Sequence, residues 1–190
     1  MFHIAMWRER LRDALSEEAA GRPHTGQPGN VDEINDAELP NGIGTPLSDA
    51  AARSDHLLGE IIELYAALGD RPFEWFRNRT TAEAVLGNSY MHARVHIYEY
   101  LRDNGDLDAA NAVFEKAESE LRAIDAPRPQ LGTAIYNLAC ARTNQGRVGE
   151  AIELLGQAFE MRPDMRELAA ADPDLAPLRE DQRFQQLVKR

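Results

Sequence analysis

His3, His92 and His96 are the residues of this chain whose type and spacing are best suited to chemistry. His92 and His96 lie four residues apart in a strongly helical segment, and residues at i and i+4 share one face of a helix. Both imidazoles therefore point toward one spot. His3 belongs to a second helix with apolar periodicity, at the start of the chain. Three imidazoles from two helices suit a divalent metal such as zinc, nickel or iron, because neutral nitrogen donors leave coordination positions for water or a thiolate.

Glu99 is the candidate catalytic residue beside this triad. It follows His96 by three residues and His92 by seven, so it lies close enough to accept a hydrogen bond from an imidazole or to act as a base. A His-x-x-x-His pair on its own is more often a surface or packing feature, and that reading stays open. His24 falls in a predicted loop and His56 on the polar side of its helix, so we expect both to be exposed to solvent.

Cys140 is the single cysteine, so the chain has no intramolecular disulfide, and a lone thiol suits a reducing cytosol. Its neighbours in the sequence are small and apolar, which predicts a buried packing role. Tyr90, Tyr98 and Tyr100 are also predicted to pack rather than to act as acids. The sequence contains no nucleophile elbow, P-loop or glycine-rich dinucleotide motif.

The overall charge excludes two classes of partner. A formal net charge of -11 argues against nucleic acid, whose phosphates must be neutralised, and no basic tract suits an anionic membrane. No apolar run approaches the ~20 residues of a membrane span, and the basic residues follow the apolar N-terminus rather than precede it as in a signal peptide. We therefore expect a bacterial-type cytoplasmic protein with no membrane association.

Apolar residues recur at helical spacing through most of the chain, and no strand-like alternation is found, which predicts an all-α fold. The first helix enters its apolar pattern without a capping residue, so we expect upstream sequence to have been cut away. Residues 21–46 are rich in glycine and proline and are predicted to form a long loop, and 71–76 an aromatic connector that plugs the end of a bundle. Helices are predicted over 1–20, 47–68, 80–104, 107–124, 130–144, 148–161 and, briefly, 180–188.

Two stretches of the second half resemble each other. Gly105 and Gly146 are each followed at the same offsets by two alanines that flank a large apolar residue. This pattern resembles the tetratricopeptide (TPR) repeat, closely over 132–165 and more loosely over 91–124. Segment 166–190 resembles the capping segment of such arrays. The resemblance implies a two-hairpin TPR-like module, 91–165, that binds a protein partner.

The first hundred residues resemble the DinB-like four-helix-bundle superfamily, closest to its colibactin self-resistance (DfsB/ClbS-like) branch. Three stretches carry the resemblance: residues 2–10 (FHIAMWRER), 31–35 (VDEIN) and 87–96 (GNSYMHARVH). It implies a helical bundle over 1–104 whose metal ligands match His3, His92 and His96. The first helix of that superfamily is absent here, and the 80–104 helix is shared with the repeats. Members include thiol-dependent S-transferases and isomerases, and the self-resistance branch acts on a small genotoxin.

Two functions follow as expectations. The first is a metal-dependent enzyme acting on a small-molecule substrate, by thiol transfer or by hydrolysis of the self-resistance type, with the 21–46 loop as a lid. The alternative is a non-catalytic TPR-type interaction scaffold whose histidine site is vestigial. The missing first helix would expose an apolar groove, which predicts either a homodimer or a groove filled by the loop.

Overall fold

The computed structural model describes residues 1–22 and 30–189. Within those ranges the chain is almost entirely helical, and the strands form one small antiparallel pair, so the predicted all-α fold is confirmed. None of the described helices combines the length and apolar character that crossing a membrane requires.

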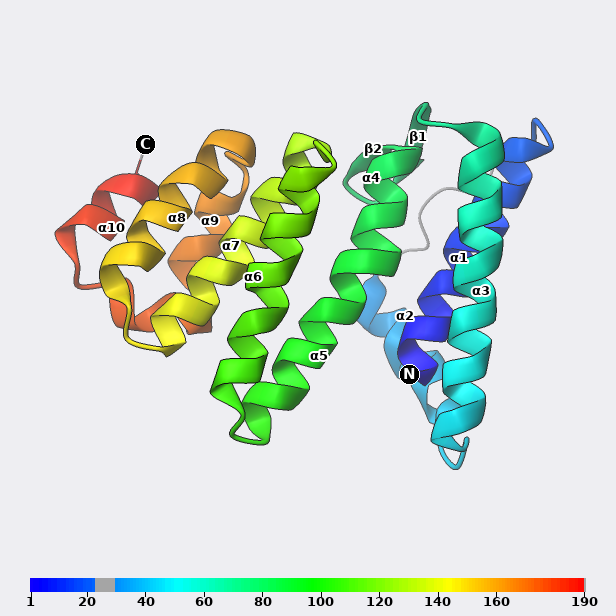
Figure 1. The fold of residues 1–190 in the computed structure, drawn as a ribbon, viewed down its shortest axis with the longest axis horizontal. Helices are drawn as coiled ribbons and strands as arrows, with labels where there is room; N and C mark the ends of the chain where they lie inside the picture. Colours follow the sequence, from blue (N-terminus) through cyan, green and yellow to red (C-terminus); the bar gives the residue numbers. More distant parts are fainter. Residues whose placement is uncertain (23–29, 190) are drawn as a thin grey trace. The chain divides into compact units, whose positions relative to one another are not determined.

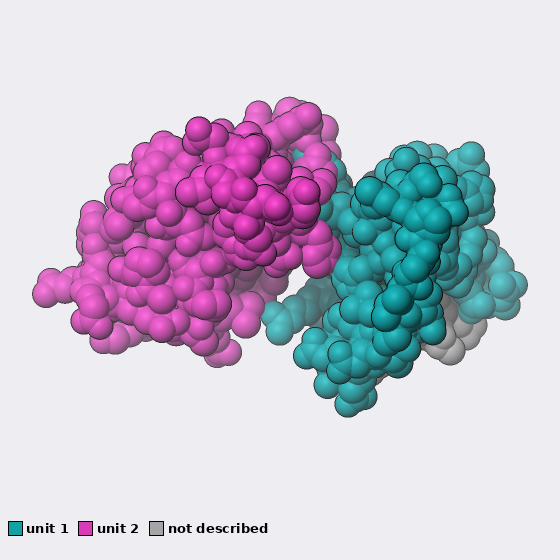
Figure 2. All heavy atoms as spheres, turned by 90° about the horizontal axis from the view of Figure 1, so that it is seen from below, with its two compact units in different colours: residues 1–93 teal, residues 94–190 magenta. Residues whose placement is uncertain are grey.

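The chain divides into two compact units, residues 1–93 and 94–190 (Figure 2). The division falls inside one helix, α5 (His92–Asp103), which the sequence analysis assigned to both the bundle and the first repeat. No glycine or proline interrupts that helix, so nothing in its composition marks the boundary.

The first unit is built around two long helices, α1 (Phe2–Ala19) and α3 (Leu47–Leu68), which pack side by side (Figure 1). Apolar residues recur every three or four positions along α1, and this face is buried. Gly69, with φ near 67°, ends α3. The core of the unit contains Leu11, Ala14, Leu15, Ile61, Leu68, Phe73, Trp75 and Ala84.

The predicted loop over 21–46 is wrong for its second half. Helix α2 (Val31–Glu38) and the 3-10 helix η1 (Leu39–Gly42) occupy it, while residues 23–29 lie outside the described part. The side chain of Asn30 accepts a hydrogen bond from the Asp32 amide and caps α2. No residue of α2 is buried. The helix therefore lacks the repeating core-facing apolar residues by which an amphipathic helix is recognised in a sequence.

The aromatic connector is a short hairpin rather than an irregular segment. Strand β1 (Pro72–Trp75) pairs antiparallel with β2 (Asn78–Thr80), and Phe73 and Trp75 point into the core of the first unit. The predicted aromatic plug is therefore present, but the segment that forms it is a β hairpin. Residues of β1 alternate between exposed and buried, but over only four residues, which is the shortest run that can indicate a strand in a sequence.

A helix in three parts follows the hairpin. It consists of α4 (Thr81–Val85), the π-helical turn η2 (Leu86–Met91) and α5. Thr80 caps α4 by accepting a hydrogen bond from the Glu83 amide. One regular α-helix was predicted over 80–104. The structure differs from this prediction by the π-helical turn.

In the second unit, α6 (Leu107–Ala123) follows α5, and α7 (Arg128–Asn144) and α8 (Val148–Met161) form a closely packed hairpin. Gly105 and Gly146 have positive φ at the turns, as the repeat pattern required. The tail contains more structure than predicted, namely α9 (Met165–Ala171), the 3-10 helix η3 (Pro173–Leu178) and α10 (Gln182–Val188). A core of its own joins α7, α8 and the tail.

Candidate metal centre

Helix α1 places His3 at the edge of its buried face. Ile4 and Trp7, beside it, are buried, and the Trp7 indole N–H donates to the side-chain oxygen of Asn35 at 3.0 Å. This bond ties α2 to the start of α1. His3 itself is half-buried, and its Nε2 lies 3.0 Å from His92 Nε2, with the two rings nearly perpendicular at 4.9 Å between centroids.

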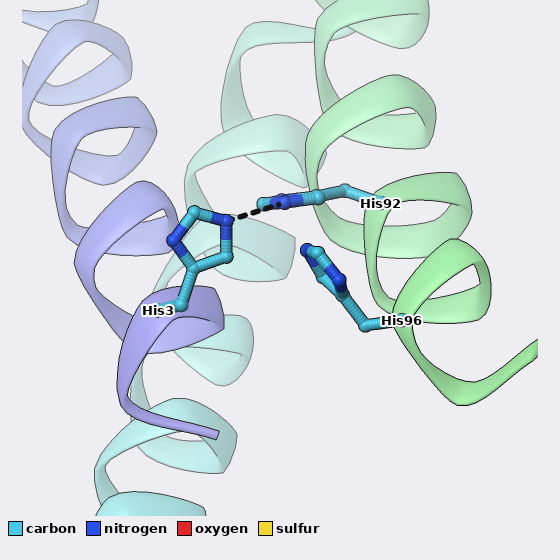
Figure 3. Close-up of side chains that lie close together, drawn as sticks. All are labelled: His3, His92 and His96. Carbon is cyan, nitrogen blue, oxygen red and sulfur yellow. Dashed lines mark hydrogen bonds between the residues drawn. The ribbon is translucent and has the colours of Figure 1, made fainter. Parts of the chain in front are cut away.

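His92 and His96 project from consecutive turns of α5, so the helix itself fixes their spacing. Figure 3 shows all three rings turned toward the space between α1 and α5. One nitrogen of each imidazole lies within 4.8 Å of the others. Two nitrogens bound about 2.0–2.1 Å from one tetrahedral zinc lie roughly 3.4 Å apart. The three donors therefore need only small side-chain rotations to meet around an ion.

Glu99 lies behind His96 on the same helix. Its Oε2 is 3.0 Å from His96 Nδ1, and both side chains are partly exposed. A carboxylate accepts hydrogen bonds and does not donate them, so this contact places the imidazole proton on Nδ1. The lone pair of His96 then lies on Nε2, the nitrogen that a carboxylate–histidine–metal arrangement presents to the ion.

The π-helical turn that precedes His92 is anchored to α1. Asn88 donates from Nδ2 to the Trp7 carbonyl at 3.0 Å, and the Arg8 guanidinium donates to the Ser89 carbonyl at 3.2 Å. Arg8 also donates to the carbonyl and hydroxyl oxygens of Ser54 on α3, at 2.9 and 2.7 Å. Its side chain is buried, and burial lowers its pKa although Asp55 nearby acts in the opposite sense.

Arg8 and Asn88 are the residues near the site that the sequence analysis did not identify. One signal was present for Arg8: it follows Ile4 by four residues and therefore lies on the apolar stripe of α1. A charged residue on a buried face must find acceptors inside the protein. Asn88 gave no comparable signal, because an asparagine within a helix usually faces solvent.

His56 does not join the group. It is 75 % exposed on α3, where it lies 3.7 Å from Glu60, so the prediction of an exposed position is confirmed. His24 lies outside the described residues. Among the described residues, the group therefore consists of His3, His92 and His96, with Glu99 beside them.

A second group of possible ligands lies in the second unit, where Cys140, Asp172 and Asp174 come within 4.8 Å of one another beside a pocket of about 80 Å³. Its polar atoms are already engaged. The Tyr136 hydroxyl donates to Asp172 Oδ2 at 2.7 Å, and the other oxygen of Asp172 caps η3 through the Asp174 amide. Burial raises the pKa of the Cys140 thiol, which keeps it protonated and a poor ligand.

Comparison of the chain with protein-family models, with curated proteins and with solved structures finds no match in any of the three. The DinB-like and TPR-like resemblances therefore stay predictions, and the function proposed below is based on the geometry of the site.

Proposed function

We propose that this protein binds a divalent transition metal through His3, His92 and His96 and uses it to act on a small molecule. The observation that carries the proposal is the convergence of three imidazole nitrogens within 4.8 Å. His3 Nε2 and His92 Nε2 lie 3.0 Å apart, and His96 brings a third ring nitrogen to the same place. The three side chains come from two helices that lie far apart in the sequence. A chance i, i+4 pair on one helix would not bring in a third histidine from another helix.

The donor set indicates the chemistry. Three neutral imidazoles suit zinc, nickel or iron and leave the charge of the cation uncompensated. A metal held in this way supplies a Lewis acid with open positions that lowers the pKa of water or of a thiol. Either thiol transfer or hydrolysis of a small molecule is consistent with that environment, in line with the DinB-like resemblance.

Glu99 has a defined part in this proposal. Its Oε2 accepts a hydrogen bond from His96 Nδ1, with 3.0 Å between the two atoms, and this contact orients the ring. Glu99 is about half exposed, which also leaves it able to exchange a proton with solvent or with a substrate. We therefore assign it to orienting His96 first and to general-base work second. The single buried thiol fits a reducing compartment, and we place the protein in the cytoplasm.

Metal analysis of protein purified without an affinity tag tests the proposal. We expect about one equivalent of metal per chain after reconstitution with zinc or nickel, and loss of that equivalent in His92→Ala and His96→Ala. His56→Ala is the matched control, because His56 is exposed on α3, where it lies beside Glu60 and not beside the triad. Cobalt(II) reconstitution adds a visible spectrum that reports on the number of nitrogen ligands.

Absence of stoichiometric metal in the wild type would contradict the proposal and favour the alternative, a TPR-type scaffold with a vestigial histidine site. Equal loss of metal in His56→Ala and His92→Ala would place the ion elsewhere. A protein partner bound through the second unit and a homodimer both stay as predictions, to be measured by light scattering and by affinity capture.

A further inference from the structure

The π-helical turn Leu86–Met91 ends at the residue before His92. A π-helical turn closes hydrogen bonds from i to i+5, so it takes up one residue more than an α-helical turn. Each residue of an α-helix advances the side-chain direction by about 100°. If the same six residues formed a regular α-helix, His92 and His96 would therefore be turned by about 100°.

Both anchors of this turn come from the part of α1 that carries His3. Asn88 donates to the carbonyl of Trp7, and Ser89 accepts from Arg8. Trp7 and Arg8 follow His3 by four and five residues, which is a little over one helical turn. The same short stretch of α1 thus fixes the position of His3 and the position of the turn that precedes His92.

We infer that the π-helical turn, anchored by Arg8 and Asn88, is the positioning element that makes His92 face His3. Its role in metal binding rests on the function proposed above, but the geometric role does not. With side chains about 5–6 Å from the helix axis, a rotation of 100° moves an imidazole by roughly 8 Å. That displacement is several times the ~2.0–2.1 Å of a metal–nitrogen bond, so relaxation of the turn to a regular α-helix with all six residues retained dismantles the triad.

Asn88→Ala tests the inference directly, because it removes one anchor and lets the six residues of the turn relax to a regular α-helix. The variant that combines Asn88→Ala with deletion of Tyr90 is the rescue, since about five residues of an α-helix cover the same rotation as about six of a π-helical turn. Asn88→Ala with Tyr90→Ala is the matched control for the deletion, because it removes the same side chain and keeps the number of residues.

The readout is the contact between the His3 and His92 rings in metal-free protein, measured by nuclear Overhauser effects between their ring protons. We expect this contact in the wild type and in the variant that combines Asn88→Ala with deletion of Tyr90, and its loss in Asn88→Ala with or without Tyr90→Ala. Retained contact in Asn88→Ala would overturn the inference, and so would equal loss in the variant that also lacks Tyr90. Circular dichroism checks that each variant keeps its helices.

The anchors provide a second test that does not depend on a deletion folding. Asn88→Ala removes the bond to the Trp7 carbonyl, while Asn35→Ala removes the bond to the Trp7 indole and leaves the turn untouched. We expect Asn88→Ala to weaken zinc affinity about 10–100-fold, as for other residues that orient metal ligands, and Asn35→Ala to have little effect. Equal effects of the two substitutions would count against the turn.

The two proposals fail in different ways. If the wild type shows the His3–His92 contact but binds no zinc, the metal function is wrong and the positioning role of the turn stands. If the wild type binds zinc and Asn88→Ala binds it equally well, the positioning role is wrong and the metal function stands.

Discussion

Cys140 is the only cysteine in the sequence, and its thiol is buried beside Asp172 and Asp174. Burial raises the pKa of the thiol, and the two carboxylates raise it further by repelling a thiolate. The same environment raises the pKa of Tyr136, whose hydroxyl donates to Asp172. The sulfur and the phenol therefore remain protonated and hold α7 to the segment that follows α9.

The raised thiol pKa predicts low reactivity. Cys140 should react with a thiol reagent at pH 8 far more slowly in native protein than in urea-unfolded protein, because the thiolate is the reactive form. The folded-state pKa lies above the unfolded-state value, so this group's contribution to stability is complete below about pH 8.5 and is lost as the pH rises above it. Ile124→Cys, at a position 65 % exposed, is the control and should react quickly. A native Cys140 as reactive as that control would contradict the assignment.

At the residue scale, the sequence predicted that the three histidines come together but did not identify the residues that support them. His92 and His96 were recognised by their spacing of four, which is a property of one helix. The bonds from Arg8 to Ser54 and from Asn88 to Trp7 join elements 46 and 81 residues apart, and no local pattern encodes such a pairing. The orienting contact of Glu99 was predictable, because it too is local to α5.

At the scale of elements, the length of α3 agrees with its apolar pattern. Not every apolar residue of the helix is buried, since Leu47 and Ile62 are 72 % and 55 % exposed. The buried face contains Ser54, whose oxygens receive the Arg8 guanidinium. Burying a cation requires polar acceptors, which explains a serine on this face.

The hairpin of α7 and α8 gives a prediction at this scale. A Cβ on Gly132 of α7 would lie 2.9 Å from Met161 Cβ and 3.0 Å from Arg162 Cγ. We expect Gly132→Ala to lose about 1–3 kcal/mol through overpacking, less its gain in helix propensity, which would lower the melting temperature. Gly156→Ala on α8 meets nothing within 4 Å and should gain up to ~1 kcal/mol. Equal melting temperatures for the two variants would show that the helices are not in close contact at Gly132.

At the scale of the whole molecule, the described residues form a hydrophobic core within each of the two units. One gathers α1, α3 and the β hairpin around Leu11, and the other gathers α7, α8 and the tail around Leu155. Periodicity predicted most helices of both units and the turns at Gly105 and Gly146. It did not locate the division at residues 93 and 94, because an uninterrupted helix crosses it.

Two core substitutions test this division. Leu11→Ala and Leu155→Ala each open a cavity at a fully buried position and should cost about 2–5 kcal/mol. Hydrogen exchange followed by mass spectrometry should show faster exchange mainly in peptides of 1–93 for the first variant and of 94–190 for the second. Equal acceleration in both sets of peptides for either variant would mean that the chain unfolds as one cooperative body.

The extra residue of the π-helical turn also bears on how such a gene diverges. The six residues of the π-helical turn cover about the same rotation as about five of an α-helix, so loss of a single codon between Ser89 and His92 leaves the reading frame, both anchors and the facing of the imidazoles almost unchanged. In related genes, this short interval can therefore differ in length by one residue while the proposed site persists.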